Sequence, residues 1–543
     1  MQYTGEAHGT IAAVVNLVRG FSSHSSHYVV PQSTRKRQGP EELRYLEAMG
    51  VFSVPSQETC DALIQAYFVY VHPLLPILDA SELLVQYESA GYRGINLLLL
   101  WSMFVNAAGF LDQDTLERAG YKSHRAFKET AYDRAKLLYD TAWNENQTTL
   151  LQAVLLMSHH HADEQDRFEA WHWTGVAISL CQAAGLHRLP ANAPEGRGPW
   201  NESRHRLLRR ICWSCFCRDK WIALFRGRPA RMRLEDCKLG RPVPEDVMHD
   251  LQRLPPSLKV THLPLDPGKV GHAWCKSVEI GVLLGRVLDL SISSETSNTQ
   301  SICDVMEADL IKCDWPLEDN NSGMNDFERL CTSQSRLLFH STCVAFWRIR
   351  ALPSSTSTTV IAESSQTHIV EKARTAASKF NIVLEEVVNR DLFKYLMPPT
   401  VGALIPPMHF HLFDCLATKA SVRVLGSHRL QLCMQVLSEL KTIYWAASFT
   451  LKLFECAREK LARRSGTSRS GRGSNIHEPL QSDDPSIITS SLSNGHQDLL
   501  DPQFLLADYN FEGFFSPTTM YHDSMFLYSM PNGGGIGLDD QIF

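Results

Sequence analysis

Three cysteines fall close together in one short stretch, and their spacing could support metal or redox chemistry. They are Cys212, Cys215 and Cys217 of the segment RICWSCFCRDKW, residues 210–221. A Cys-x-x-Cys pair supplies two ligands to a structural Zn²⁺ when a second pair follows on another turn. The same pair is a disulfide-exchange centre when it opens a helix after a strand. The stretch therefore suggests a zinc site or a redox site.

Helical geometry argues against both chemistries. Each residue of a helix advances by about 100°, so Cys212 and Cys215 share one face whereas Cys217 lies about 200° from Cys215. The chain contains no second Cys-x-x-Cys pair and no His-x-x-x-His pair, and the first pair falls inside the predicted helix. A continuous stripe at helical spacing runs through the stretch: Leu208, Ile211, Cys212, Cys215, Asp219 and Ile222. The pattern predicts a buried helix without a bound metal.

A run of three histidines is the second candidate for metal binding. His159, His160 and His161 precede three acids, at positions 163, 164 and 166. Adjacent side chains point in different directions, and the run falls between two predicted helices, so we expect a solvated loop. The chain has no glycine-rich phosphate loop, nucleophile elbow or His-Glu-x-x-His motif. We therefore predict that the protein is not an enzyme and uses no cofactor. An all-α enzyme with paired carboxylates on facing helices is the alternative.

Basic residues crowd the same region as the cysteines. Residues 204–233 contain ten Lys or Arg against one acid, Asp219, which lies within the apolar stripe. A surface that neutralises DNA phosphates needs such a cluster. The favoured interpretation is structural, because a buried carboxylate requires a cationic partner. We expect about half of the basic residues to be surface charges and Arg218 or Arg228 to pair with Asp219.

Composition and charge limit the remaining classes. The chain of 543 residues is 44% apolar, which is ample for a large core. Of its 59 acidic residues ten lie in residues 473–543, where no Lys or Arg occurs, so 53 basic and 49 acidic residues remain elsewhere. The fourteen cysteines mostly stand singly among apolar residues, as buried thiols do in a reducing compartment. Residues 95–111 contain Asn and Ser and are too short to span a membrane, so we expect a buried helix and no membrane association.

Helical periodicity dominates residues 41–460, and we predict an all-α body over this range. Thr149 and Gln152 form a capping-box pattern that would open one helix. A second helix is predicted over residues 173–184, with Gly185 as its left-handed C-cap. Residues 1–40 are expected to be a disordered lead. Loops are expected at residues 190–199, 241–268, 291–301 and 353–367.

Beyond residue 460 the composition changes abruptly. Residues 461–498 are first basic and then rich in Ser, Asp and Asn, which is typical of a linker. Residues 499–543 combine acids with aromatic residues and are expected to be disordered. Acid repulsion can leave the aromatic rings available to a hydrophobic groove, as in an activation segment, although such a tail could also dock on the body. The candidate activation residues are Phe504, Tyr509, Phe511, Phe514, Phe515 and Phe526.

Three segments together resemble a known family. HPLLPILD (residues 72–79), WTGVAISLCQAAGLHR (173–188) and RRICWSCFCRDKWIALFRGRP (209–229) follow the order of the fungal transcription factor regulatory domain of zinc-cluster activators, also called the middle homology region. The resemblance covers roughly residues 45–350, and residues 45–73 look most like the branch of cutinase and fatty-acid-responsive regulators. The family's motif falls on Trp213, Cys215, Arg218, Asp219, Trp221, Gly227, Arg228 and Pro229.

The sequence departs from that family at its beginning. Such regulators carry an N-terminal six-cysteine zinc cluster that reads DNA, followed by a basic linker. The first cysteine here is Cys60, so we expect this module to be absent, lost or outside the sequence. Arg35, Lys36 and Arg37 could be a remnant of the linker or a nuclear import signal.

The resemblance implies a nuclear regulator of transcription in a filamentous fungus, with metabolic or secondary-metabolite genes as its targets. The helical body would be the regulatory and dimerisation domain, pairing with itself or with a zinc-cluster regulator, and the tail would recruit the transcription machinery. Any DNA contact would be indirect, through a partner with a zinc cluster, or would depend on an N-terminal segment that is missing from this sequence. The alternatives are a modulator that sequesters an activator and a sensor whose helical core binds a small molecule.

Overall fold

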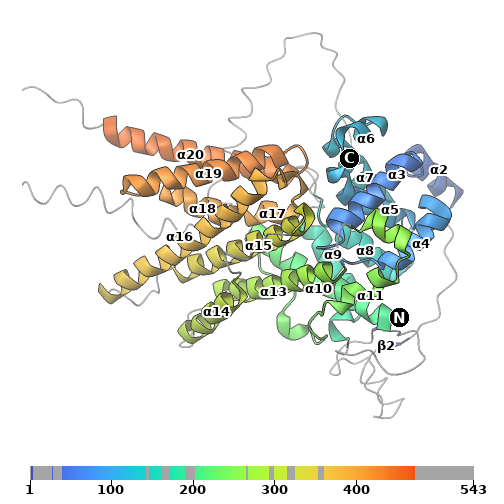
Figure 1. The fold of residues 1–543 in the computed structure, drawn as a ribbon, viewed down its shortest axis with the longest axis horizontal. Helices are drawn as coiled ribbons and strands as arrows, with labels where there is room; N and C mark the ends of the chain where they lie inside the picture. The colour runs from blue at the N-terminus through green and yellow to red at the C-terminus, as the bar shows by residue number, and fades with distance from the viewer. Residues whose placement is uncertain are drawn as a thin grey trace, which may run out of the picture.

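The computed structural model describes residues 2–3, 27–28, 39–141, 146–160, 170–189, 202–263, 267–292, 299–314, 324–351 and 360–470. The described chain is almost entirely helical (Figure 1), as predicted. One two-stranded antiparallel pair joins β1 (Gln2–Tyr3) to β2 (His27–Tyr28) within the segment that was predicted to be a lead without structure.

The first group of helices gathers at the right of Figure 1 and surrounds α5. Its members are α2 (Pro40–Ala48), α3 (Gln57–Ala66), α4 (Ala80–Ala90), α5 (Leu97–Ala107), α6 (Gln113–Arg118), α7 (His124–Asp140), α8 (Gln147–Met157), α9 (Ala170–Ala183), α11 (Glu245–Arg253) and α12 (Pro256–His262).

The second group extends to the left of Figure 1, with neighbouring helices packed side by side. It comprises α13 (Pro267–Ile292), α14 (Thr299–Cys313), α15 (Asp326–Arg350), α16 (Val360–Asn389), α17 (Pro398–Ala403), α18 (Ile405–Asp414), α19 (Ala420–Leu440) and α20 (Trp445–Ser470). The last helix continues past the predicted end of the body at residue 460.

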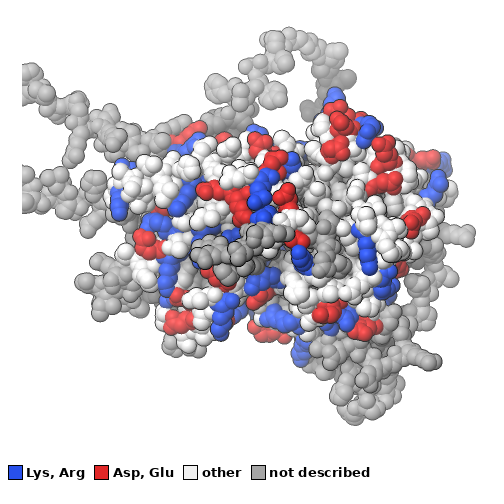
Figure 2. Space-filling model, viewed as in Figure 1, with Lys and Arg blue, Asp and Glu red and all other residues white. Residues whose placement is uncertain are grey.

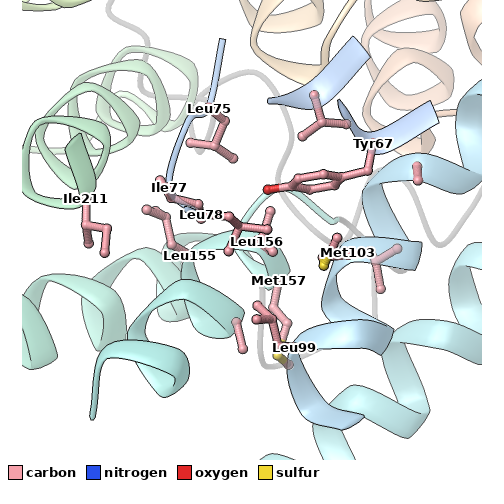
Figure 3. Packing of buried hydrophobic residues seen from close by; sticks show 14 of the residues in the cluster. Tyr67, Leu75, Ile77, Leu78, Leu99, Met103, Leu155, Leu156, Met157 and Ile211 are labelled. Carbon is pink, nitrogen blue, oxygen red and sulfur yellow. The ribbon is translucent and has the colours of Figure 1, made fainter. Parts of the chain in front are cut away.

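The core of the first group is built from α5, α8 and the segment before α4. Figure 3 shows Leu155, Leu156 and Met157 of α8 facing Leu99 and Met103 of α5. The π-helical turn Tyr67–Val71 and the following residues 72–79 close this core from one side. The predicted buried helix within residues 95–111 is therefore confirmed as α5, whose apolar residues are covered by other helices instead of lipid. None of the described helices has the length and apolar character needed to cross a membrane.

Helix α10 (Glu202–Arg226) joins the two cores. Its residues from Leu208 to Phe216 pack in the first cluster, whereas Trp221 and Leu224 pack in the second, with α13, α15 and α16. Helix α13 also contributes to both clusters, with Trp274 and Val278 in the first and Ile280 and Leu284 in the second. Helices α10 and α13 thus connect the two cores.

Local signals predicted some boundaries and missed others. Gly185 has φ 65°, as expected of a left-handed C-cap. The cap of α8 is Asn146, whose side chain accepts from the Thr148 amide, so the expected capping box at Thr149 is wrong. The side chain of Gln152 instead donates to the Ile77 carbonyl at 2.6 Å. Tertiary contact outcompetes the local motif because this amide is buried.

Three expected loops contain helical residues. Residues 241–268 form α11 and α12, each starting after a proline, which suits the first turn of a helix. Helix α16 begins at Val360, inside the expected loop 353–367, and α13 and α14 enter the expected loop 291–301 from both sides. The loop expected at 190–199 lies outside the described residues.

Candidate functional site: the central helix and the cavity beside it

The cysteine-rich stretch forms uninterrupted helix, as its apolar spacing predicts. Cys212 and Cys215 are fully buried, and both contact the thiol of Cys181 on α9. Hydrogen bonding to Cys181 and burial raise the pKa of Cys212 and of Cys215 well above the ordinary value, so both remain neutral thiols. Cys217 points elsewhere, toward Gly281 of α13. Among the described residues no cluster of three or more His, Cys, Asp or Glu is arranged to hold a metal ion.

Asp219 is fully buried and binds the loop that follows α10. Its Oδ2 accepts from the backbone amides of Arg231 and Met232, both at 2.9 Å, and from Lys220 Nζ at 3.2 Å. Lys220 also donates to the Met232 carbonyl. The expected partner, Arg218 or Arg228, is wrong, because backbone donors and the neighbouring lysine bind Oδ2, whereas the buried Oδ1 has no hydrogen-bond partner among the described residues.

The Gly-Arg-Pro sequence ends α10 by a recognisable C-cap. Gly227 has φ 61°, and the amide of Arg228 donates to the Ala223 carbonyl at 3.1 Å, which is the Schellman pattern. Pro229 follows where the chain must leave the helix. Arg228 then lies over the Trp171 ring, with its guanidinium carbon 5.3 Å from the ring centroid. Gly227, Arg228 and Pro229 of the family motif are thus explained by the way the helix ends.

Several basic residues of α10 form buried ion pairs and cannot contact DNA. Arg210 donates to Asp250 at 3.1 Å, and Arg209 donates to Asp246 at 3.1 Å. Asp250 also accepts from the Ala80 amide at 3.0 Å, so the pair links α10, α11 and the start of α4. On the face shown in Figure 2, Lys and Arg alternate with Asp and Glu over the described surface. This distribution favours the structural interpretation of the basic cluster.

Arg218 is a buried cation without an acidic partner among the described residues. Its side chain is 5% exposed and donates to the Ser158 carbonyl, and its Nε has no hydrogen-bond partner there. Burial lowers the pKa of the guanidinium to about 9, and the charge of Arg226 contributes in the same direction. A buried cation of this kind is costly unless an anion reaches it.

The histidine run does not form the expected solvated loop. His159 and His160 are each 6% exposed, and His159 Nδ1 lies 3.0 Å from the Leu155 carbonyl. Burial lowers the pKa of His160 to about 3 and that of His159 well below its ordinary value. The prediction failed because the run follows α8 inside the protein, where the His160 ring packs against Tyr132. His161 lies outside the described residues.

A cavity of about 70 Å³ lies beside α10 where the two cores meet. Arg218, Ser214 and Trp221 line it from α10, and His159 lines it from the end of α8. Its other walls come from residues 74–75 of the HPLLPILD segment and from α13, α15 and the start of α17. Ser214 Oγ is buried and, like Arg218 Nε, has no partner among the described residues. No acid occurs among the described residues that line the cavity.

The structure brings together one part of the predicted site and leaves the other undescribed. Of the motif residues of α10, Arg218 and Trp221 line the cavity. Trp213 does not line it and donates from Nε1 to the Gly240 carbonyl at 3.1 Å. Arg35, Lys36, Arg37 and the aromatic residues of the tail, 504 to 526, lie outside the described residues. The sequence interpretation missed Ser214, although its spacing of four residues from Arg218 places both on one helix face.

Comparison with known proteins agrees with the predicted resemblance. Residues 64–259 match the fungal specific transcription factor domain. The region includes α8, α9, α10 and α11. It also contains all three segments that carry the motifs. Residues 64–259 are thus similar to this domain.

Individual relatives extend the likeness beyond that region. The chain is 26% identical over 465 residues to Cutinase transcription factor 1 beta of Fusarium vanettenii, covering 78% of this chain and 52% of that protein. It is 24% identical over 463 residues to Cutinase transcription factor 1 alpha of the same fungus, covering 83% and 49%. A shorter match, 26% identical over 251 residues, is to the Acetamidase regulatory protein of Aspergillus oryzae, covering 45% and 30%. The chain spans about half the length of the two cutinase transcription factors.

Proposed function

We propose that this protein is a transcription regulator that acts in the nucleus of a filamentous fungus. The observation that carries the proposal is the match of residues 64–259 to the fungal specific transcription factor domain. The matches to the two cutinase transcription factors cover 78% and 83% of the chain, which supports extending the regulatory role to the helices beyond that domain.

The helical body acts as a regulatory and dimerisation domain, pairing with itself or with a zinc-cluster regulator. DNA is reached through the partner. The burial of Arg209, Arg210, Arg218 and Lys220 supports this division, because these four charges are unavailable to phosphates. The target genes belong to metabolism or secondary metabolism, in line with the names of the cutinase and acetamidase regulators.

Deletion of the gene tests the proposed role directly. A tagged protein expressed at its native level should be found in nuclei, and transcripts of a defined set of metabolic genes should change severalfold in the deletion strain. A cytoplasmic protein whose loss leaves the transcript profile unchanged would contradict the proposal. Replacing Arg35, Lys36 and Arg37 by Ala in the tagged chain tests the import signal, with the exposed Arg204, Arg228 and Arg233 replaced as the matched control.

The acidic and aromatic tail serves as the activation segment. Residues 473–543 fused to a heterologous DNA-binding domain should activate a reporter, and replacing Phe504, Phe511, Phe514 and Phe515 by Ala should abolish that activity. A matched fusion in which four Asp or Glu residues of the tail are replaced by Asn or Gln distinguishes the contribution of the negative charge to activation from that of the aromatic side chains. Silence of the unaltered fusion would favour the modulator that sequesters an activator.

A further inference from the structure

We propose that the cavity between the two cores binds a small carboxylate ion, held by the Arg218 guanidinium and the Ser214 hydroxyl. The proposal concerns an effector of the helical body and does not depend on the transcriptional role. Its starting point is that Ser214 and Arg218 both line this cavity, and that Ser214 Oγ and Arg218 Nε are buried without an acceptor among the described residues.

The two donors are placed for one ligand. Ser214 and Arg218 are separated by four residues of α10, so their side chains lie on the same face, one turn apart. Both side chains are more than nine-tenths buried, with 4% and 5% exposed, and neither Ser214 Oγ nor Arg218 Nε has a partner among the described residues. An anion in the cavity would accept from both.

The charge of the ligand follows from the surroundings of Arg218. The described lining of the cavity includes no carboxylate, and the charged side chain that lowers the pKa of Arg218, in addition to burial, is another cation, Arg226. A guanidinium offers parallel N–H donors that match the two oxygens of a carboxylate. A bound carboxylate therefore neutralises a charge that the described fold leaves without a counter-ion.

The size and polarity of the cavity limit the rest of the ligand. An apolar cavity of roughly 150 Å³ accommodates benzene, so about 70 Å³ admits a ligand of roughly three to five heavy atoms. Much of the remaining lining is apolar and includes Leu74, Leu75, Trp274, Val278 and Leu338. A short aliphatic carboxylate of the size of acetate or propionate would place its carboxylate at Arg218 and Ser214 and its alkyl group against the apolar lining.

The position of the cavity gives binding a structural consequence. Its lining joins residues of the first core, such as Leu75 and Trp274, to residues of the second, such as Trp221 and Leu338. A ligand held there contacts both groups of helices at their junction. Occupancy should therefore stabilise one relative arrangement of the two groups, as a regulatory effector does.

Calorimetric titration and thermal unfolding of the purified full chain test the proposal. Propionate and acetate should bind saturably and raise the midpoint of unfolding, whereas propionamide, which has nearly the same shape without the charge, should not. Hexanoate should bind at least tenfold more weakly than propionate because it exceeds the cavity. Equal binding of propionamide, or equal competition by chloride at constant ionic strength, would refute a carboxylate site.

Variants assign the binding to the two donors. Arg218→Met should abolish propionate binding, and Ser214→Ala should weaken it about tenfold. The matched control is Arg228→Met, since Arg228 is an exposed arginine near the end of the same helix. Retention of wild-type affinity in Arg218→Met would overturn the proposal. If that variant does not fold, the carbon-13 spectrum of labelled propionate is compared between wild type and Ser214→Ala. The signal should shift or broaden more with wild type than with Ser214→Ala. An unshifted, unbroadened signal with wild type would overturn the proposal, because water alone would then fill the cavity.

Discussion

Replacing Asp219 by Ala should destabilise the protein more than any exposed ion pair could. The carboxylate accepts two backbone N–H donors at 2.9 Å and the Lys220 ammonium at 3.2 Å, all in the protein interior. Hydrogen bonds to a charged group contribute about 1.5–3 kcal/mol each, but three donors on one oxygen do not add fully. The loss also leaves Lys220 buried without its carboxylate, so we expect the free energy of unfolding to fall by about 3–5 kcal/mol.

Two further variants separate charge from shape. Asp219→Asn keeps an acceptor oxygen for the backbone amides and loses the charge, so about 1–3 kcal/mol should be lost. Asp140→Ala is the matched control, because Asp140 forms an exposed pair with Lys136 at 3.0 Å, and removing it should cost about 0.5 kcal/mol.

Denaturant unfolding of the full chain, followed by circular dichroism, measures these differences. Limited trypsin digestion supplies a local readout, because the loop released from Asp219 contains Arg231 and Arg233 as cleavage sites. Cleavage there should be faster in Asp219→Ala than in Asp140→Ala. A loss of stability below about 1 kcal/mol in Asp219→Ala, with unchanged cleavage, would refute the assigned role of the carboxylate.

Three other predictions follow from single positions. Cys215→Ala should lower the free energy of unfolding by about 1–2 kcal/mol, measured by denaturant unfolding. Mass spectrometry under native conditions should show that no metal is released by the substitution. A stoichiometric metal in the wild type would contradict the assignment of Cys215 as a free thiol. Burial lowers the pKa of Lys128 to about 7, so above that pH the unfolded chain binds more protons than the folded chain. The free energy of unfolding of wild type should therefore rise by up to about 2 kcal/mol relative to that of Lys128→Met between pH 7 and pH 9. A difference between the two proteins that stays constant with pH would exclude this burial effect. Gly227→Ala should cost about 1–2 kcal/mol because of its left-handed backbone, whereas Gly39→Ala, with φ −67° and open space around its Cβ position, should be close to neutral in thermal unfolding.

The helical class and the buried nature of α10 could be predicted because they depend on periodicity. Apolar residues at spacings of three and four lie on one face of a helix, and that face is buried against neighbouring elements. In α10 this face includes Leu208, Ile211 and Cys215. The same holds for the C-cap at Gly185, which depends on one residue's backbone freedom. The expected loop over residues 241–268 failed because prolines mark helix starts as well as loops.

The charged part of the site could not be predicted because its partners are distant in sequence. The sequence interpretation paired Asp219 with an arginine, whereas the structure pairs it with backbone amides twelve and thirteen residues later. His159 and His160 were expected in solvent, and only the packing of α8 against its neighbours buries them.

By itself, the sequence determined that the body is helical, that the cysteines of α10 face different directions, and that three ordered motifs resemble the fungal transcription factor domain. These properties follow from the period of the helix and from residue order. Tertiary structure decided which ions are paired and where a cavity remains. Arg210 finds Asp250, whereas Arg218 on the same helix meets no acid among the described residues, because only the packing of helices far apart in sequence determines what each side chain faces.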